Sequence, residues 1–334
     1  MLLKSGHVVA VIRMTAMAAL VISATLSVTY AADEVAGYPN KPIRVVVGFS
    51  AGSGVDVSAR VVAQKLNESW GQPVIADNRP GAGGTIAAQI VSGASPDGYT
   101  LISVSAAHVI SPAIYPKLKY DTLKDFTGIT TTVSLPNVLV VSPSLGVNSV
   151  KGLVELAKAK PGQLMFSSGG VGSGTHFASE LFKSRAAIDV GHVPFKGIPE
   201  ALTETITGRV AFTMSPVANV LPQAKAGKVI ALAVAPAKRV SVLPDVPTMA
   251  EAGVAGYSWD TWFGLLVPAG TPRAIVRKLN KEVTRVIMLP DVKKHWDAMG
   301  AEALPMTPER FDKFIAEQML IIAKLAKAAN VKFE

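Results

Sequence analysis

The chain contains no cysteine among its 334 residues. This absence excludes disulfide bonds, thiol nucleophiles and metal sites built on cysteine ligands. Aromatic residues make up only 6% of the sequence, so there is no evident platform of rings on which nucleic-acid bases could stack. Acidic residues are outnumbered by basic ones, 24 to 33, but the basic residues are scattered along the chain. We therefore expect no nucleic-acid partner.

Long apolar runs are also missing after the first 32 residues. Before that point, Lys4 and Arg13 precede an apolar stretch that begins at Met14, and the small residues Ala31 and Ala32 follow shortly after its end. This arrangement predicts a signal peptide, residues 1–32, that is cleaved near Ala31 or Ala32 and directs export to the periplasm. An uncleaved membrane anchor is the alternative, which the polar residues inside the stretch disfavour.

The remainder of the chain, about 300 residues, suits two domains of ordinary size. Residues 43–49 form a short β-branched run that predicts a buried strand, and apolar residues at helical spacing from Val57 to Trp70 predict the helix that follows. Similar pairs of strand and helix recur along the chain. Strands that alternate with helices form parallel sheets covered by helices, so the sequence predicts an α/β protein with parallel or mixed sheets.

Two glycine-rich loops each follow a predicted strand and precede a predicted helix. The first spans residues 48–56, where Asp56 is predicted to cap the helix, and the second spans residues 167–176. Small residues let backbone N–H groups approach a ligand, and a helix N-terminus favours negative charge. Either loop alone is a weak signal, because such turns often only redirect the chain. As a pair at corresponding points of two α/β units, they predict a site for a small carboxylate.

The first loop, Gly48-Phe49-Ser50-Ala51-Gly52, also matches the G-x-S-x-G motif of α/β serine hydrolases, with Ser50 as the nucleophile. Two features disfavour this alternative. The helix is predicted to begin only near Asp56, whereas a nucleophile elbow turns directly into its helix. Only one strand precedes Ser50, so no earlier loop supplies an oxyanion-hole donor. We therefore expect no catalytic residue and no enzyme.

Nucleotide and metal sites are not expected either. The second loop lacks the Gly-Lys-Ser/Thr ending of a phosphate-binding loop. The histidines available as metal ligands are His108, His176, His192 and His295, and none lies at a ligand spacing from another. The sequence therefore predicts no metal and no cofactor.

An ordered set of short motifs resembles the Bug-type solute receptors of tripartite tricarboxylate transporters. The matching segments are residues 38–47, 56–60, 71–74, 78–84, 96–101, 167–176, 192–197, 243–248, 262–264 and 268–272. The resemblance implies a two-lobed type II periplasmic-binding-protein fold with a ligand cleft between the lobes. It implies that residues 38–138 and 263–334 form the first lobe and that residues 139–262 form the second, inserted lobe.

The resemblance also implies that the two loops hold a ligand carboxylate through N–H groups, hydroxyls and ordered water. The site residues that it implies are Phe49, Ser50, Ala51, Gly52, Ser105, Ser167, Ser168, Gly169, Gly170, Ser173 and Thr175. It further implies a monomeric receptor that delivers a di- or tricarboxylate, or an aromatic carboxylate, to the membrane subunits of a transporter. A receptor that signals to a sensor kinase is an alternative that the sequence leaves open.

The sequence departs from the family pattern in two places. Ala211 stands where the family often has aspartate, and Ser50 and Ser53 stand where many members have alanine or glycine. We expect the hydroxyls to alter how the carboxylate is held, and the missing aspartate to change the distal pocket or the hinge. Aromatic residues between 257 and 262 indicate either an aromatic wall of the pocket or core packing.

Overall fold

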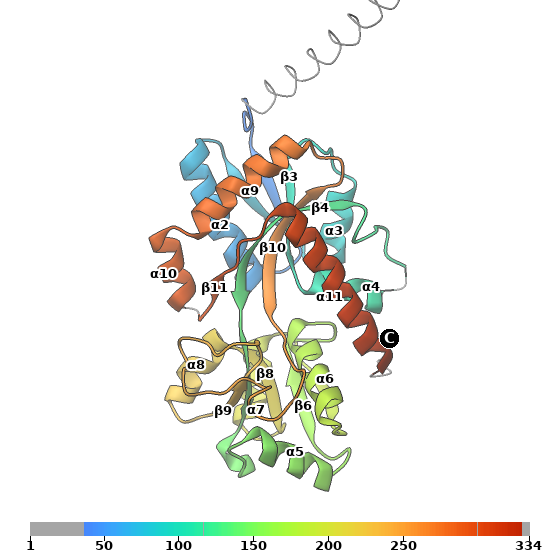
Figure 1. Ribbon diagram of the computed structural model, residues 1–334, viewed down its shortest axis with the longest axis vertical. Coiled ribbons are helices and arrows are strands. Elements are labelled where there is room, and N and C mark those ends of the chain that lie inside the picture. The colour runs from blue at the N-terminus through green and yellow to red at the C-terminus, as the bar shows by residue number, and fades with distance from the viewer. Residues whose placement is uncertain (1–36, 116, 299, 329–334) are drawn as a thin grey trace, which may run out of the picture.

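The computed structural model describes residues 37–115, 117–298 and 300–328, and the predicted signal peptide lies outside these ranges. The chain forms two lobes stacked along its long axis, each built on its own sheet (Figure 1). The sheet of the first lobe contains strands β1 (Ile43–Val47), β2 (Val74–Asn78), β3 (Thr100–Ser105), β4 (Phe126–Leu135), β10 (Thr261–Pro268) and β11 (Glu302–Ala303). Their order is β11-β4-β10-β3-β1-β2, in which β1, β2 and β3 are parallel and β10 is antiparallel to β3 and β4.

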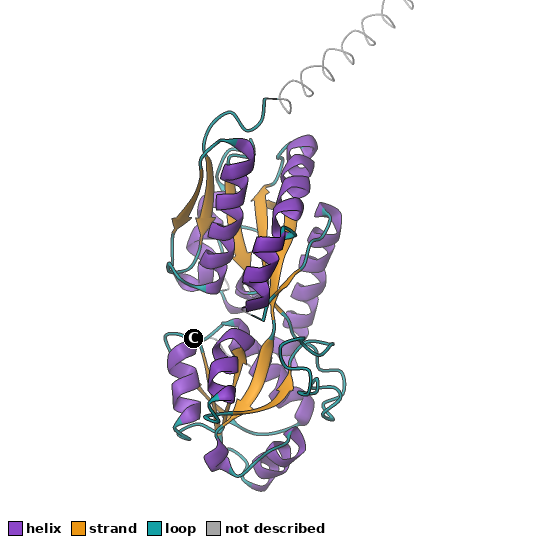
Figure 2. Cartoon of the chain, turned by 90° about the vertical axis from the view of Figure 1, so that its left-hand side faces the viewer, coloured by secondary structure: helices purple, strands orange, loops and turns teal. Residues whose placement is uncertain are grey.

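Helices cover both faces of this sheet (Figure 2). They are α2 (Gly54–Trp70), α3 (Thr85–Ser92), α4 (Ala107–Ile114), α9 (Arg273–Ile287), α10 (Pro290–Ala298) and α11 (Pro308–Ala328), with the short 3-10 helix η1 (Ala82–Gly84) before α3. Successive side chains of a strand point to opposite faces, so Val45 and Val47 belong to the core under α2 and α9. Val46 belongs to the core under α3, α4 and α11. Both faces of β1 are therefore buried, as its unbroken apolar run predicts.

The second lobe has a five-stranded sheet in the order β7-β6-β8-β5-β9. Its elements are β5 (Asn137–Val141), η2 (Pro143–Leu145), α5 (Val150–Ala159), β6 (Met165–Ser168), α6 (Gly174–Ala186), β7 (Gly191–Pro194), α7 (Ile198–Ile206), β8 (Phe212–Pro216), α8 (Val217–Lys225) and β9 (Ile230–Val234). Strands β6, β7 and β8 are parallel, and β5 is antiparallel to both of its neighbours. Two mixed sheets flanked by helices confirm the predicted two-lobed α/β fold class.

The chain passes between the two sheets at Pro136 and again just before Thr261. Strand β4 ends at Leu135 and β5 begins at Asn137, so one residue separates strands of different lobes. The side-chain amide of Asn137 donates a hydrogen bond to Thr261 Oγ1 at 2.9 Å and so ties the two crossings together. The lobe boundaries at residues 138/139 and 262/263 stay a prediction.

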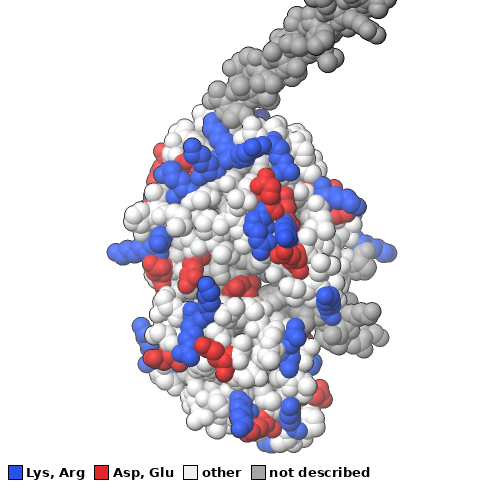
Figure 3. Space-filling model, in the orientation of Figure 1, with Lys and Arg blue, Asp and Glu red and all other residues white. Residues whose placement is uncertain are grey.

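Charged side chains of both signs are spread over the two lobes (Figure 3). In this view, basic side chains gather at the top of the first lobe, over helix α9. That helix carries five basic residues and a single acidic one, Glu282. Among the residues that the structure describes, no helix is both long enough and apolar enough to cross a membrane.

Candidate functional site

The two predicted loops lead into helices whose first residues lie against the same strand. A Cβ atom on Gly54, the first residue of α2, would lie 3.0 Å from Phe263 Cζ on β10. A Cβ atom on Gly174, the first residue of α6, would lie 3.3 Å from Thr261 Oγ1 on the same strand. Thr261 and Phe263 are two residues apart, about 7 Å along one face of β10. Two helix N-termini from different lobes therefore meet at the lobe crossing.

The first loop is held by its own aspartate. Ser53 caps α2, since Ser53 Oγ accepts a hydrogen bond from the backbone N–H of Asp56 at 3.4 Å. The prediction that Asp56 caps this helix is therefore wrong, and the helix begins at Gly54, two residues earlier than expected. The Asp56 carboxylate turns back toward the loop and accepts the N–H of Gly52 at 2.8 Å.

Two further donors complete the Asp56 site. Arg60 Nε donates to the carboxylate at 3.0 Å, and Asn78 Nδ2 donates to it at 2.7 Å. Burial alone would raise the pKa of Asp56, but the hydrogen bonds from Arg60, Gly52 and Asn78 outweigh burial and lower that pKa. Asn78 Nδ2 also donates to the carbonyl of Phe49 at 3.0 Å. The charged, buried carboxylate of Asp56 therefore holds the end of the first loop directly, at Gly52, and the start of the loop through Asn78, at Phe49.

The tip of the first loop is exposed and offers free donors. Ser50, Ala51 and Gly52 are all exposed. The N–H groups of Ser50 and Ala51 have no hydrogen-bond acceptor within the described part of the chain, whereas the N–H of Gly52 is used by Asp56. Ser105, at the end of β3, accepts a hydrogen bond from the N–H of Ala107 at 3.3 Å and keeps its hydroxyl hydrogen for another partner.

A small cavity of about 10 Å³ lies behind the first loop, with Phe49, Ser105 and His108 among its lining residues. This space holds about one water molecule. No lining residue carries a fixed charge, and burial lowers the pKa of His108 to about 4, so its ring is neutral near pH 7. In this conformation the cavity is too small for a second carboxylate of a ligand.

The second loop uses several of its predicted donors internally. The N–H of Gly169 donates to Thr175 Oγ1 at 3.1 Å, and the N–H of Gly170 donates to Ser168 Oγ at 3.2 Å. These two N–H groups are therefore not free for a ligand in this conformation. The loop is instead closed on itself by hydroxyls, which shapes the turn that leads into α6.

Free donors remain where the second loop becomes helix. Ser173 caps α6 by accepting a hydrogen bond from the N–H of His176 at 3.2 Å. The N–H groups of Val171 and Gly174 have no acceptor among the residues described. Because the first N–H groups of a helix have no intrahelical partner, this end of α6 can receive an anion.

Ser167 has an internal role. Its side chain is fully buried, its hydroxyl donates to the carbonyl of Ala201 at 2.9 Å, and its own carbonyl accepts from Thr213 Oγ1 at 2.9 Å. These bonds join β6 to α7 and β8. The structure therefore places Ser167 inside the second lobe, beneath the loop rather than on its surface.

Ser168 and His192 resemble a nucleophile and its base, since Ser168 Oγ lies 2.7 Å from His192 Nε2. Ser168 is fully buried, however, and its hydroxyl also lies 3.2 Å from the carbonyl oxygen of Gly170. Burial, with a smaller contribution from Lys183, lowers the pKa of His192 to about 4. Ser168 is therefore closed off from solvent in this conformation, and Ser50 has no side-chain hydrogen bond to a described base. The geometry is that of a binding loop.

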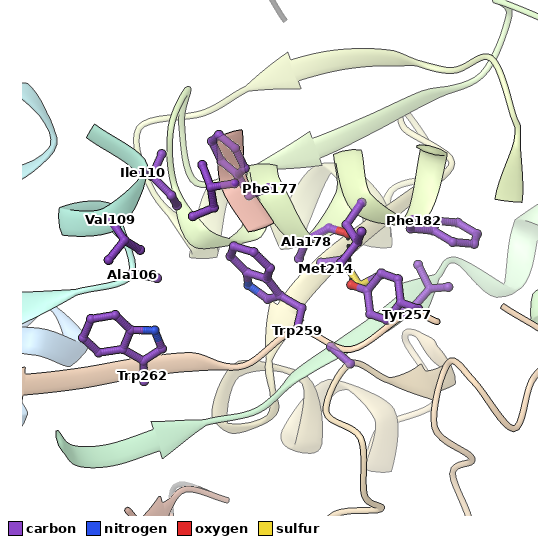
Figure 4. Close-up of a cluster of buried hydrophobic side chains, with 14 of the residues drawn as sticks. Ala106, Val109, Ile110, Phe177, Ala178, Phe182, Met214, Tyr257, Trp259 and Trp262 are labelled. Atoms are coloured by element: carbon purple, nitrogen blue, oxygen red, sulfur yellow. Dashed lines mark hydrogen bonds between the residues drawn. The ribbon is translucent and has the colours of Figure 1, made fainter. Parts of the chain in front are cut away.

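The aromatic residues at the second crossing are core. Trp259 stacks on Phe177 of α6 with ring centroids 6.3 Å apart, and Trp262 meets Phe311 of α11 edge-on at 5.6 Å. Both tryptophans are buried, and side chains of both lobes pack around them (Figure 4). Tyr257 donates its hydroxyl to the carbonyl of Ala178 at 3.0 Å. These residues join the lobes and do not form a pocket wall.

Ala211 lies away from both loops. Its N–H donates to the carbonyl of Met165 at 2.8 Å, just before the start of β8, whereas the second loop begins after Ser168 and the lobe crossing lies beside Pro216, at the far end of this sheet. Five residues of extended chain separate Ala211 from Pro216, roughly 16 Å. The expectation that the missing aspartate changes the pocket or the hinge is therefore not supported by the structure.

Two α/β lobes, with two helix N-termini facing the lobe crossing, form the architecture of a solute-binding protein. The chain belongs to the tripartite tricarboxylate transporter receptor family, whose model matches residues 58–331. It is 33% identical to protein BugT of Bordetella pertussis, over 89% of this chain and 92% of BugT. This membership confirms the predicted Bug-type family and the prediction that the chain is not an enzyme.

Solved structures show the same relationship. The R. palustris protein Rpa4515 with adipate is 34% identical and superposes with a TM-score of 0.79, covering 88% of this chain and 99% of that one. MatC from Rhodopseudomonas palustris with bound malate is 32% identical, with a TM-score of 0.74, covering 86% of this chain and 99% of MatC.

Proposed function

We propose that the protein is an exported, monomeric receptor that binds a small dicarboxylate between its lobes and delivers it to the membrane subunits of a tripartite tricarboxylate transporter. One observation carries the proposal: the N-termini of α2 and α6 meet at β10. Each helix end presents unpaired N–H groups and a partial positive charge, so two such ends on opposite sides suit one carboxylate. The adipate and malate in the two similar structures support a dicarboxylate.

The two helix ends differ in strength. The first turn of α6 carries no acidic residue, whereas the first turn of α2 carries Asp56. The negative charge of Asp56 is offset by the Arg60 guanidinium and by the hydrogen bond from Asn78. The first loop as a whole therefore does not repel an incoming anion. We infer that α6 and the N–H groups of Ser50 and Ala51 contribute most of the attraction for the carboxylate.

Closure of the lobes would bury the carboxylate among dipoles, where hydrogen bonds are stronger than in water. The lobes already touch near the second loop, since a Cβ atom on Gly172 would lie 2.6 Å from Ile114 Cδ1 of α4. The crossings at Pro136 and before Thr261 are the segments that would turn. This contact and these crossings support a hinge that closes over the ligand.

Thermal unfolding with a panel of carboxylates tests the binding proposal. A ligand at 100 times its Kd adds about 2.7 kcal/mol to the free energy of unfolding, so a bound carboxylate raises the Tm measurably. We expect a shift with adipate or malate and none with adipamide, which has the same chain without the charge. A panel of mono-, di-, tri- and aromatic carboxylates that leaves the Tm unchanged would overturn the proposal.

Uptake assays test delivery. Cells that carry the membrane subunits should accumulate the bound carboxylate only when the receptor is present. Binding in solution without any change in uptake would favour a receptor that signals, the alternative left open by the sequence.

A further inference from the structure

Two histidine rings lie stacked directly beneath the second loop. His176, in the first turn of α6, and His192, on β7, have ring centroids 4.0 Å apart and an interplanar angle of 12°. Phe166 of β6 continues the stack against His192, at 4.7 Å and 17°. The carboxylate contacts proposed above do not use either histidine ring.

Each histidine holds a different part of the loop. The N–H of Gly172 donates to His176 Nδ1 at 3.2 Å, and Ser168 Oγ lies 2.7 Å from His192 Nε2. A ring nitrogen that accepts a hydrogen bond carries no proton, so His176 is neutral with its proton on Nε2. Gly172 has a φ of 77°, a left-handed conformation that glycine adopts without strain and can also leave easily. The hydrogen bond from its N–H to His176 holds Gly172 in this one conformation.

The surroundings keep both rings neutral. Burial, the neighbouring His192 and Lys183 lower the pKa of His176 to about 3. Burial and Lys183 lower the pKa of His192 to about 4. Two charged groups of α6 lie beside the stack: Glu180, with Oε1 4.0 Å from His176 Nε2, and Lys183, 3.6 Å from that same oxygen. The accepting nitrogen of His176 is therefore available throughout the neutral pH range.

We propose that His176 and His192 are positioning residues for the carboxylate site: through Gly172 and Ser168 they fix the second loop in the conformation that aims the N-terminus of α6 at the ligand. This inference rests on the proposed function and adds the residues on which the affinity of the second loop depends. Two stacked phenylalanines would fill the same space but would leave the N–H of Gly172 and the hydroxyl of Ser168 without these partners.

Four variants separate positioning from packing. His176→Phe keeps the ring but loses the acceptor, whereas His176→Asn places an acceptor oxygen where Nδ1 lies. His192→Phe and His192→Gln form the matched pair at the other ring, because a glutamine reaches the position of Nε2. Loss of one such hydrogen bond corresponds to about a tenfold change in an equilibrium constant.

The first readout needs no ligand. We expect amide hydrogen exchange at Gly172 to be about tenfold faster in His176→Phe than in the native protein, and His176→Asn to restore native exchange. We also expect the nitrogen NMR spectrum of the native protein at neutral pH to show His176 Nδ1 without a proton. A protonated Nδ1, or equal Gly172 exchange in all variants, would overturn the proposal.

The second readout is adipate affinity by calorimetry. We expect both phenylalanine variants to bind adipate about tenfold more weakly than the native protein, and His176→Asn and His192→Gln to recover most of the loss. Native affinity in both phenylalanine variants would overturn the link from these rings to the ligand. If the native protein does not bind adipate, the choice of adipate under the proposed function fails, while the exchange and NMR results still decide whether the histidines position the loop.

Discussion

The carboxylate of Asp56 accepts the backbone N–H of Gly52 at 2.8 Å, so the first loop is organised around an anion of its own. Arg60 and Asn78 hold the same carboxylate, and Asn78 also binds the carbonyl of Phe49. The loop therefore meets a ligand in a fixed conformation rather than folding around it. Binding then loses less conformational entropy than it would with a flexible loop.

Replacing Asp56 with alanine should therefore weaken both the fold and the site. The substitution leaves the N–H of Gly52 without its acceptor and takes one of two acceptors from Asn78 Nδ2, and hydrogen bonds to a charged group contribute about 2 kcal/mol. We expect a loss of about that size in the free energy of unfolding by urea, together with weaker adipate binding. Arg60→Ala is the control, because Arg60 is half exposed and its loss should change stability by less than about 1 kcal/mol. Equal losses in both variants would contradict this account.

The two capping serines form a second matched pair. Ser53 accepts from the N–H of Asp56 at 3.4 Å, and Ser173 accepts from the N–H of His176 at 3.2 Å while also lying 3.0 Å from Thr175 Oγ1. Loss of a cap costs about 1 kcal/mol. We expect Ser173→Ala to lower the Tm more than Ser53→Ala, because it breaks two contacts. A larger loss of Tm in Ser53→Ala would show that the hydrogen bond from Asp56 N–H to Ser53 Oγ, although it is 3.4 Å long, stabilises its helix more than the two contacts of Ser173 do.

Much of the architecture was predictable because apolar patterns mark it directly. The run at residues 43–47 and the helical spacing of α2 follow from burial on one or both faces. Strand β4 was not predicted, since the polar residues from Thr130 to Thr132 interrupt its pattern, yet all three are buried in the sheet. Helix α4 was also not predicted, because it is short and contains Pro112. Neither element has the periodicity that a sequence pattern requires.

The two loops could be placed from sequence, but their hydrogen bonds could not. Glycine-rich loops before helices located both helix ends. Which N–H groups are free depends on side chains that fold back, such as Asp56 on Gly52 and Thr175 on Gly169, and spacing alone does not reveal these bonds. The stack of His176 on His192 joins residues sixteen positions apart on different elements, so each histidine looks isolated in the sequence.

Gly172 provides a test of the contact between lobes. Its φ of 77° strains any residue with a side chain, and an added Cβ would lie 2.6 Å from Ile114 Cδ1. We expect Gly172→Ala to lose about 1 kcal/mol of stability and to bind adipate more weakly. Ile114→Ala in the same chain should restore part of the affinity by making room, while the backbone strain remains. No recovery of affinity in the double variant would show that the lobe contact has no part in binding.

Asp260, just before β10, gives a prediction on pH. Burial, and then the nearby Glu302, raise the pKa of Asp260 to about 6, and no described residue forms a hydrogen bond or ion pair with its carboxylate. An acid whose folded-state pKa lies above its unfolded value of about 3.9 adds stability below the unfolded pKa and loses it as pH rises through the folded pKa. Asp260→Asn should therefore raise the free energy of unfolding by about 2 kcal/mol at pH 8, and the gain should shrink below pH 5. Urea unfolding at both pH values measures the difference. Glu302→Gln should give a smaller gain in the free energy of unfolding, since it removes only the repulsion from Glu302 and leaves Asp260 buried. If the gain for Asp260→Asn were the same at both pH values, burial of this carboxylate would not be what limits stability.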